Sequence, residues 1–387
     1  MSRTLETLFS RTTTSGSYIR ELDGLRFIAI ASVICVHITG IWTASVGRTY
    51  DDMGDIARVF YRMTLLGGYG VELFFMISGF VLAIPFCQNA LAGGRPVDLR
   101  KYFWRRVTRL EPPYLVSMLF FFIMMPLWGK GSYGELFPNL LASLAYLHNA
   151  IYNVGSVINN NAWSLEVEVQ FYLLVPLILT ALSMGLLLRR TVMVLAVIGF
   201  SLHPLWLQEN FPVSILQFFQ FFALGILFCD LRTTDWSERP SSTASDLPAF
   251  LALPAFFWVN LTQPELARSL ANPWLIALFF YSALWGKWHS RLLSWGWLPI
   301  VGGMCYSIYL LHARILSLVL HHGFSRFELT GNFPLDFGII FAGSLPPVIL
   351  LSALFFLLIE KPCMNPRWPQ DLWGVLGNFA RRRGQNA

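Results

Sequence analysis

Two ionisable residues share the first long apolar segment of the chain, residues 18–42. Arg26 lies near one end of this segment and His37 follows it by eleven residues. Eleven residues make slightly more than three helical turns, so both side chains should lie on one face of a helix, about 16 Å apart along its axis. Ionisable groups inside a membrane helix are costly and usually mark a pathway or a reaction site. We therefore expect this segment to carry functional residues.

Three carboxylates could lie at the depth of His37. Glu72 enters the second apolar segment, and Glu166 and Glu168 lie at the start of the fourth. Two residues turn a helix by about 200°, so at most one of Glu166 and Glu168 can face His37. A histidine oriented by a carboxylate is the usual general base for a hydroxyl proton. The alternative is that His37 is a hydrogen-bonded packing residue and Arg26 an interfacial arginine.

The composition predicts an all-α polytopic membrane protein. The 387 residues are 55% hydrophobic and 13% charged, with a mean hydropathy of +0.54. A soluble chain carries about twice this share of charge, and apolar runs of about 20 residues can span a bilayer. The net charge of +6 does not indicate nucleic-acid binding, because the basic residues fall at helix ends. The five cysteines have no metal-ligand spacing, so we expect neither a metal site nor a disulfide framework.

We predict ten transmembrane helices with both termini in the cytosol. This orientation places most of the 28 Lys and Arg residues in cytosolic segments, as the positive-inside rule requires. The weakly apolar stretch 137–152 is predicted to be a re-entrant or surface helix, because a span there would reverse this bias. Three parts result: a cytosolic N-terminal segment (1–21), a membrane domain (22–362) and a basic cytosolic tail (363–387). The spans are expected at about 22–42, 65–86, 113–128, 163–187, 191–208, 213–231, 247–261, 273–288, 296–320 and 334–359.

A basic stretch follows the second span and is predicted to be a cytosolic loop. It ends in Arg105, Arg106 and Arg109. Guanidinium groups bind phosphate in a bidentate manner, so this loop could hold a phosphorylated donor such as coenzyme A. The alternative is that the cluster only anchors the cytosolic side of the membrane.

Two further stretches combine small or polar residues with apolar ones. Glycines in the stretch 67–80 permit close helix approach, and packing is the favoured explanation for Gly79. In the ninth predicted span, Tyr306, Tyr309 and His312 lie three residues apart and share a face. Such a polar stripe faces protein or a cavity and not lipid. Packing and substrate binding are equally compatible with it.

Together these motifs resemble the acyltransferase-3 family of integral-membrane O-acyltransferases. The resemblance covers nearly the whole chain, and the motifs occur in the family's order. Phe27 stands where the family often has glycine, and Met304-Cys305 where serine is common. The matching motifs are Leu22-Asp23-Gly24-Leu25-Arg26 with His37, the stretch 70–80, Arg105-Arg106-x-x-Arg109 leading into Pro112, Trp163-Ser164-Leu165-x-Val167-Glu168-x-Gln170-Phe171-Tyr172, the stretch 306–312 and Glu360-Lys361-Pro362.

The resemblance implies transfer of an acyl group, by default acetyl, across a bacterial cytoplasmic membrane. The donor would be cytosolic acyl-CoA, a co-substrate and not a permanently bound cofactor. The acceptor would be a hydroxyl of a cell-surface glycan or a lipid-linked sugar on the outer side. Membrane lipid is the other expected partner, and the oligomeric state is open. We expect no extracytoplasmic esterase-like domain after the last span and no cleavable signal peptide before the first.

The resemblance also assigns roles to residues. Arg26 and His37 form the essential pair, with His37 as the general base oriented by Glu72 or Glu168. The acyl-CoA would bind to Arg26 and to the arginine cluster defined above (Arg105, Arg106 and Arg109). The expected substrate-binding residues are Asp23, Trp163, Ser164, Tyr306, Tyr309 and His312.

Other functions stay open at this stage. The acceptor could be a macrolide, another small molecule or a lipid, and the acyl group could pass through a covalent acyl-enzyme. A different class is a proton-coupled membrane transporter that uses His37 and Glu72 as a relay. We find no inverted repeat of the kind that many transporters contain, which favours the acyltransferase.

Overall fold

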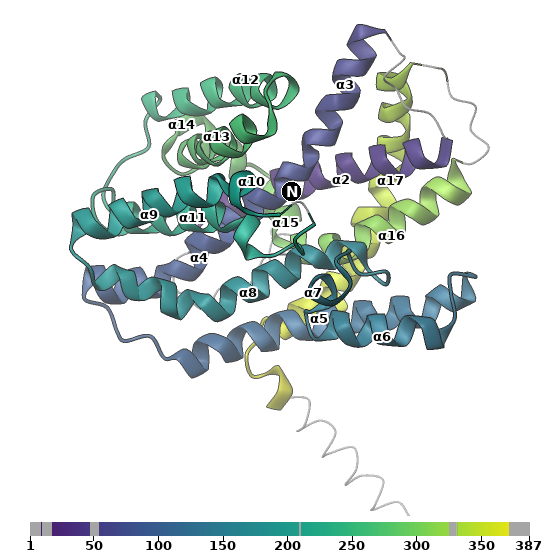
Figure 1. The fold of residues 1–387 in the computed structure, drawn as a ribbon, viewed down its shortest axis with the longest axis horizontal. Coiled ribbons are helices and arrows are strands. Elements are labelled where there is room, and N and C mark those ends of the chain that lie inside the picture. Colours follow the sequence, from purple (N-terminus) through teal and green to yellow (C-terminus); the bar gives the residue numbers. More distant parts are fainter. Residues whose placement is uncertain are drawn as a thin grey trace, which may run out of the picture.

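The computed structural model describes residues 9, 18–46, 54–208, 210–324, 330 and 332–370. Over these residues the chain is helical and contains no strand (Figure 1), which confirms the all-α prediction. Most of the predicted N-terminal segment and of the basic tail lies outside the described residues. The helices are α2 (Arg20–Val46), α3 (Asp55–Leu65), α4 (Gly70–Ala92), α5 (Leu99–Leu127), α6 (Tyr133–Leu144), α7 (His148–Tyr152), α8 (Trp163–Ile178), α9 (Leu186–Ser201), α10 (His203–Trp206), α11 (Phe219–Thr233), α12 (Leu247–Thr262), α13 (Glu265–Trp285), α14 (Lys287–Leu293), α15 (Leu298–Gly303), α16 (Cys305–Gly323), α17 (Phe333–Phe355) and α18 (Lys361–Cys363).

Among the described residues, six helical stretches are long and apolar enough to cross a membrane. The protein is therefore a helical membrane protein. The predicted spans at 191–208 and 213–231 correspond to α9 and α11, which have only 16 and 15 residues. The count of ten and the orientation of the termini stay predictions. The six stretches are Arg20–Ala44, Asp55–Ala92, Leu99–Leu127, Asn160–Ser183, Ala244–Thr262 and Phe333–Cys363.

The stretch predicted as a re-entrant or surface helix forms two short helices, α6 and α7. A capping box of Ser132 and Glu135 starts α6. The chain then breaks at Tyr146, whose φ of 56° is left-handed, before α7 begins. With 12 and 5 residues, neither helix reaches the length that a bilayer requires. Helix α6 lies alongside α5 (Figure 1).

The basic stretch after the second span is helical, so the prediction of a loop there was wrong. Helix α5 begins at Leu99 and includes the whole arginine cluster. The Asp98 carboxylate caps this helix by accepting a hydrogen bond of 3.1 Å from the Lys101 backbone N–H. Such a cap typically contributes about 1 kcal/mol to helix stability, which lets the helix start well before its apolar part.

Helix α5 also continues through a proline that could have ended it. Pro112 has no N–H group, so the Thr108 carbonyl four residues earlier lacks its helical donor. The Trp368 indole N–H donates a hydrogen bond of 2.8 Å to this Thr108 carbonyl. A side chain from the end of the chain thus supplies the missing donor and helps α5 to remain helical between its basic and apolar parts.

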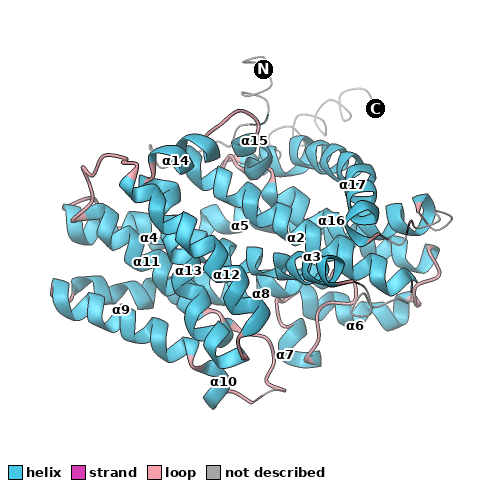
Figure 2. Ribbon diagram, turned by 90° about the horizontal axis from the view of Figure 1, so that it is seen from above, coloured by secondary structure: helices cyan, strands magenta, loops and turns pink. Residues whose placement is uncertain are grey.

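Helix α2 lies between two groups of helices. Viewed from above (Figure 2), α4 and α11 are on one side of it, and α16 and α17 are on the other. Leu25 and Ala29 of α2 belong to the apolar core that includes α4 and α11. Ile30 and Ile34 belong to the core that includes α16 and α17. Because α2 packs on both sides, the two faces that flank its ionisable residues are held in place.

Helices α4 and α11 approach each other at two glycines. A Cβ on Gly79 would lie 2.3 Å from the Phe222 carbonyl oxygen, and a Cβ on Gly225 would lie 2.2 Å from the Met76 carbonyl oxygen. Both distances are far below van der Waals contact, so only glycine fits without a shift of the backbone. The packing role predicted for Gly79 is confirmed.

Gly225→Ala should lower the melting temperature of the purified protein in detergent by several degrees. Overpacking of this kind costs about 1–3 kcal/mol, because the new methyl group meets the α4 backbone. Gly199→Ala in α9 is the matched control, since a Cβ there meets nothing within 4 Å. Equal melting temperatures for the two variants would contradict the close α4–α11 contact.

Candidate functional site

A cavity of about 710 Å³ opens among α2, α4, α5, α8 and α16. Its size falls in the usual range of about 300–1,000 Å³ for small-molecule and cofactor sites. Side chains of five helices line it, and some of these helices are several hundred residues apart in the sequence. Of the residues predicted to act on ligands, those that line the cavity are Asp23, Arg26, Arg105, Arg106, Arg109, Ser164, Glu168, Tyr306 and Tyr309.

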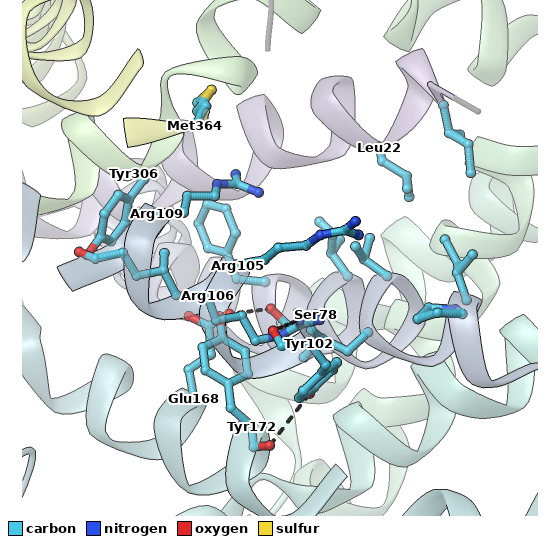
Figure 3. A pocket seen from close by; sticks show the side chains of 18 of the residues that line it. Leu22, Ser78, Tyr102, Arg105, Arg106, Arg109, Glu168, Tyr172, Tyr306 and Met364 are labelled. Carbon is cyan, nitrogen blue, oxygen red and sulfur yellow. Dashed lines mark hydrogen bonds between the residues drawn. The ribbon is translucent and has the colours of Figure 1, made fainter. Parts of the chain in front are cut away.

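Arg105 and Arg109 point into the cavity (Figure 3). They are one turn apart, so α5 presents both on the same face. In the part of the chain that the structure describes, neither guanidinium group forms a hydrogen bond or an ion pair. An arginine in a cavity with its donors free can bind a phosphate or carboxylate oxygen. These two residues are the strongest candidates for binding an anionic ligand.

Arg106 is held by aromatic rings. Its guanidinium carbon lies 3.5 Å from the centre of the Tyr102 ring and 5.8 Å from that of Tyr172. One guanidinium nitrogen donates a hydrogen bond of 2.8 Å to the Tyr102 carbonyl, and Glu168 is an electrostatic neighbour. Cation–π contact and the hydrogen bond fix the side chain in place. Arg106 therefore contributes a fixed positive charge to the cavity wall, whereas Arg105 and Arg109 are free.

The two carboxylates of α8 diverge, as the helical period predicts. Glu168 lines the cavity and accepts a hydrogen bond of 2.6 Å from the Ser78 hydroxyl of α4. Glu166 is buried elsewhere and accepts bonds of 2.9 and 3.1 Å from the backbone and side-chain nitrogens of Asn149. Glu166 thus joins α7 to α8, and of these two carboxylates only Glu168 lines the cavity.

Arg26 lines the cavity as the partner of a buried carboxylate. Its guanidinium donates to Asp23 Oδ1 at 2.5 Å, and the Tyr18 hydroxyl donates to Asp23 Oδ2 at 2.9 Å. The Asp23 side chain is 2% exposed and that of Arg26 is 15% exposed. A buried charge needs such a partner because its desolvation is otherwise uncompensated. Asp23 therefore orients the head of Arg26 at the cavity wall.

Tyr309 joins α16 to the start of α8 at the cavity wall. Its hydroxyl lies 2.7 Å from the Ser164 hydroxyl and donates a hydrogen bond to the Asn161 carbonyl. Both Tyr309 and Ser164 line the cavity. The neighbouring Trp163 does not, because its ring packs on Phe218 with centroids 5.5 Å apart. A polar bridge between two helices thus bounds the cavity here.

The two predicted histidines do not line the cavity. The His37 and His312 rings are in edge-to-face contact, with centroids 5.0 Å apart. The His312 centroid is 6.2 Å from that of Tyr309. Tyr309 thus lines the cavity and is also a neighbour of His312.

Neither predicted carboxylate partner reaches His37. Across the described residues, no hydrogen bond joins His37 to Glu72 or to Glu168. Glu72 is instead an electrostatic neighbour of Tyr69. The structure thus brings the arginines, Glu168 and Tyr309 together, and it leaves His37 paired with His312.

Three residues of this site were missed by sequence reasoning: Ser78, Tyr102 and Tyr172. A signal for two of them was present, because Tyr102 precedes Arg106 by four residues and Tyr172 follows Glu168 by four. Residues four apart are neighbours on a helix surface. Nothing comparable identified Ser78, because its partner lies on another helix.

These helices and this cavity define a membrane protein with an internal polar site, and comparison assigns its family. The chain belongs to the acyltransferase-3 family, whose family model, described as an acyltransferase domain, matches residues 19–359. It is similar to the O-acetyltransferase OatA of Staphylococcus aureus (strain NCTC 8325 / PS 47), with 25% identity over 385 residues. That match covers 90% of this chain and 57% of the relative, and OatA of strain COL matches to the same extent.

A further group of Staphylococcus aureus proteins, represented by one from strain COL, is 21% identical over 402 residues. That match covers 89% of this chain and 57% of the relative. The chain therefore spans little more than half the length of the curated relatives it matches. No solved structure matches it.

Tyr309→Phe should destabilise the protein without changing its fold. Removal of the hydroxyl leaves the Asn161 carbonyl and Ser164 without a buried partner, which typically costs about 1–3 kcal/mol. Thermal unfolding in detergent measures the effect. Tyr152→Phe is the control, because Tyr152 is exposed. A melting temperature equal to that of the control variant would show that the bridge adds no stability.

Proposed function

We propose that this protein is a transmembrane O-acyltransferase. It moves an acyl group, by default acetyl, from cytosolic acyl-CoA to a hydroxyl of a cell-surface glycan or lipid-linked sugar on the outer side of a bacterial cytoplasmic membrane. The observation that carries the proposal is a cavity with free arginines in its wall, together with a histidine pair of which His312 neighbours the wall residue Tyr309. The family and the names of its O-acetyltransferase relatives support it.

In this proposal the donor enters the cavity with its phosphates toward Arg105 and Arg109. Both arginines have free donors, and guanidinium groups match phosphate oxygens in charge and geometry. Arg26, oriented by Asp23, then contacts the pantetheine arm or the thioester. The cavity volume of about 710 Å³ accommodates a ligand of this class.

The chemistry is a direct transfer of the acyl group from the sulfur atom of the thioester to the oxygen atom of the acceptor hydroxyl. His37 takes the proton from the acceptor hydroxyl, and the hydroxyl oxygen forms a bond to the thioester carbonyl carbon. The carbon–sulfur bond breaks, and the coenzyme A thiolate leaves and takes up the proton from the histidine. Because His37 does not line the cavity, a local rearrangement must bring the thioester and the acceptor hydroxyl within reach of its ring.

His37→Ala should lower kcat by about a hundred-fold or more, the usual contribution of a general base. The assay follows thiol release from acetyl-CoA by purified protein in detergent, where a gradient-driven transporter would show no turnover. His321→Ala is the matched control, because His321 is an exposed histidine of α16. Wild-type turnover by the His37 variant would refute this mechanism.

Arg105→Gln together with Arg109→Gln should raise KM for acetyl-CoA at least about ten-fold, since each charged hydrogen bond contributes about 1.5–3 kcal/mol. The change in kcat should be small, because these groups lie far from the transferred acyl group. Arg100→Gln is the control: Arg100 is an exposed residue of the same helix that does not line the cavity. If the control raises KM as much as the double variant, general surface charge and not a defined site binds the donor.

A further inference from the structure

His312 is a buried ionisable residue to which the proposed transfer assigns no task. Its side chain is 0% exposed, and it does not line the cavity. The role of substrate binding expected for its stripe suits Tyr306 and Tyr309, which line the cavity, better than it suits His312. Its ring contacts His37, with centroids 5.0 Å apart and an angle of 65° between the planes.

The backbone of α16 fixes the tautomer of His312. Its Nδ1 lies 2.9 Å from the carbonyl oxygens of both Ile308 and Tyr309. Carbonyl oxygens only accept hydrogen bonds, so Nδ1 must carry the proton. In a neutral ring Nε2 then presents a lone pair. His312 thus offers a hydrogen-bond acceptor in the interior of the bundle.

This acceptor is unused. The Nε2 atom of His312 is buried and has no hydrogen-bond partner among the described residues. Buried polar atoms are nearly always satisfied, and an exception requires an explanation. The aromatic neighbours that the structure gives it are His37 and Tyr309. The Tyr309 hydroxyl is already engaged with Ser164 and Asn161, so of these two neighbours His37 is the one that can donate.

The separation of the two rings suits a hydrogen bond between them. A nitrogen–nitrogen distance of about 3 Å places the centroids of two imidazoles about 5 Å apart. The observed separation is 5.0 Å. The described residues contain no hydrogen bond between the two rings, so the bond requires a rotation of the His37 ring, because rotation of His312 would break its bonds to the α16 carbonyls. Within the described part of the chain, neither of the two carboxylates expected to orient His37, Glu72 and Glu168, is hydrogen-bonded to it.

We propose that His312 is the positioning residue for His37. His312 Nε2 accepts a hydrogen bond from one ring N–H of His37, and this leaves the other His37 nitrogen unprotonated and directed toward the acceptor hydroxyl. The carbonyl groups of Ile308 and Tyr309 thus act through His312 as a carboxylate acts in the usual arrangement. The inference rests on the proposed function and adds to it the group that sets the tautomer of the base.

The first test uses the wild-type protein. Nitrogen-15 NMR of histidine-labelled protein in detergent distinguishes protonated from unprotonated ring nitrogens, and a His312→Gln sample assigns the signals. We expect His312 to show a protonated Nδ1 and an unprotonated, hydrogen-bonded Nε2. A protonated His312 Nε2, or one without a hydrogen bond, would overturn the inference.

The second test uses two variants and thiol release from acetyl-CoA. His312→Leu fills the space without an acceptor and should lower kcat about 10–100-fold, as loss of an outer-shell partner usually does, with KM for acetyl-CoA within about two-fold. His312→Gln keeps an acceptor oxygen near the Nε2 position and should retain most of kcat. The exposed His321→Ala should match the wild type.

The outcomes separate this inference from the proposed function. Full turnover by His37→Ala would remove the proposed function itself. If His37→Ala loses turnover while His312→Leu keeps the wild-type kcat, only the role of His312 is overturned. The same holds if His312→Leu and His312→Gln lose kcat to an equal extent. If His312→Leu does not fold, the NMR measurement on the wild-type protein decides whether His312 Nε2 accepts a hydrogen bond.

Discussion

The cost of placing ionisable groups inside an apolar helix bundle governs how this protein is built. An isolated charge there costs several kcal/mol, and many of the buried ionisable groups have a charged or polar partner. The pairs join different helices or successive turns, and they set how the helices rotate against one another. They are Arg26 with Asp23, Glu168 with Ser78, Glu166 with Asn149, Arg189 with Asp230, and Glu360 with Ser307.

Three groups that bear on the proposed reaction lack such a partner among the described residues, as does one buried oxygen of the Glu72 carboxylate. Arg105 and Arg109 have free guanidinium groups that point into the cavity, and His312 has a buried nitrogen without a partner. A phosphorylated donor would satisfy the first two, and His37 would satisfy the third. These three groups mark the two ends of the proposed reaction path.

Much of the site could be predicted because it depends on helical period. The common face of Arg26 and His37 and the divergence of Glu166 and Glu168 both follow from residue spacing along one helix. The basic stretch was misread as a loop although Asp98, a local residue, caps its helix. The sequence could not show that Trp368, 260 positions away, donates to the Thr108 carbonyl that Pro112 leaves without a helical donor. It could not be predicted either that, of the polar stripe on α16, Tyr306 and Tyr309 line the cavity and His312 does not. Neighbouring turns of one helix can face different partners.

The sequence by itself determined that the protein is helical, that it is a membrane protein and which family it belongs to, because hydropathy, helical period and motif order are properties of the chain alone. Only the tertiary structure decided which side chains are partners. The rotation of each helix about its axis is set by contacts with its neighbours, such as the close approach of Gly79 and Gly225, and no single-helix pattern contains these contacts. For that reason the spacing of His37 could be predicted from the sequence, while its contact with His312 could not.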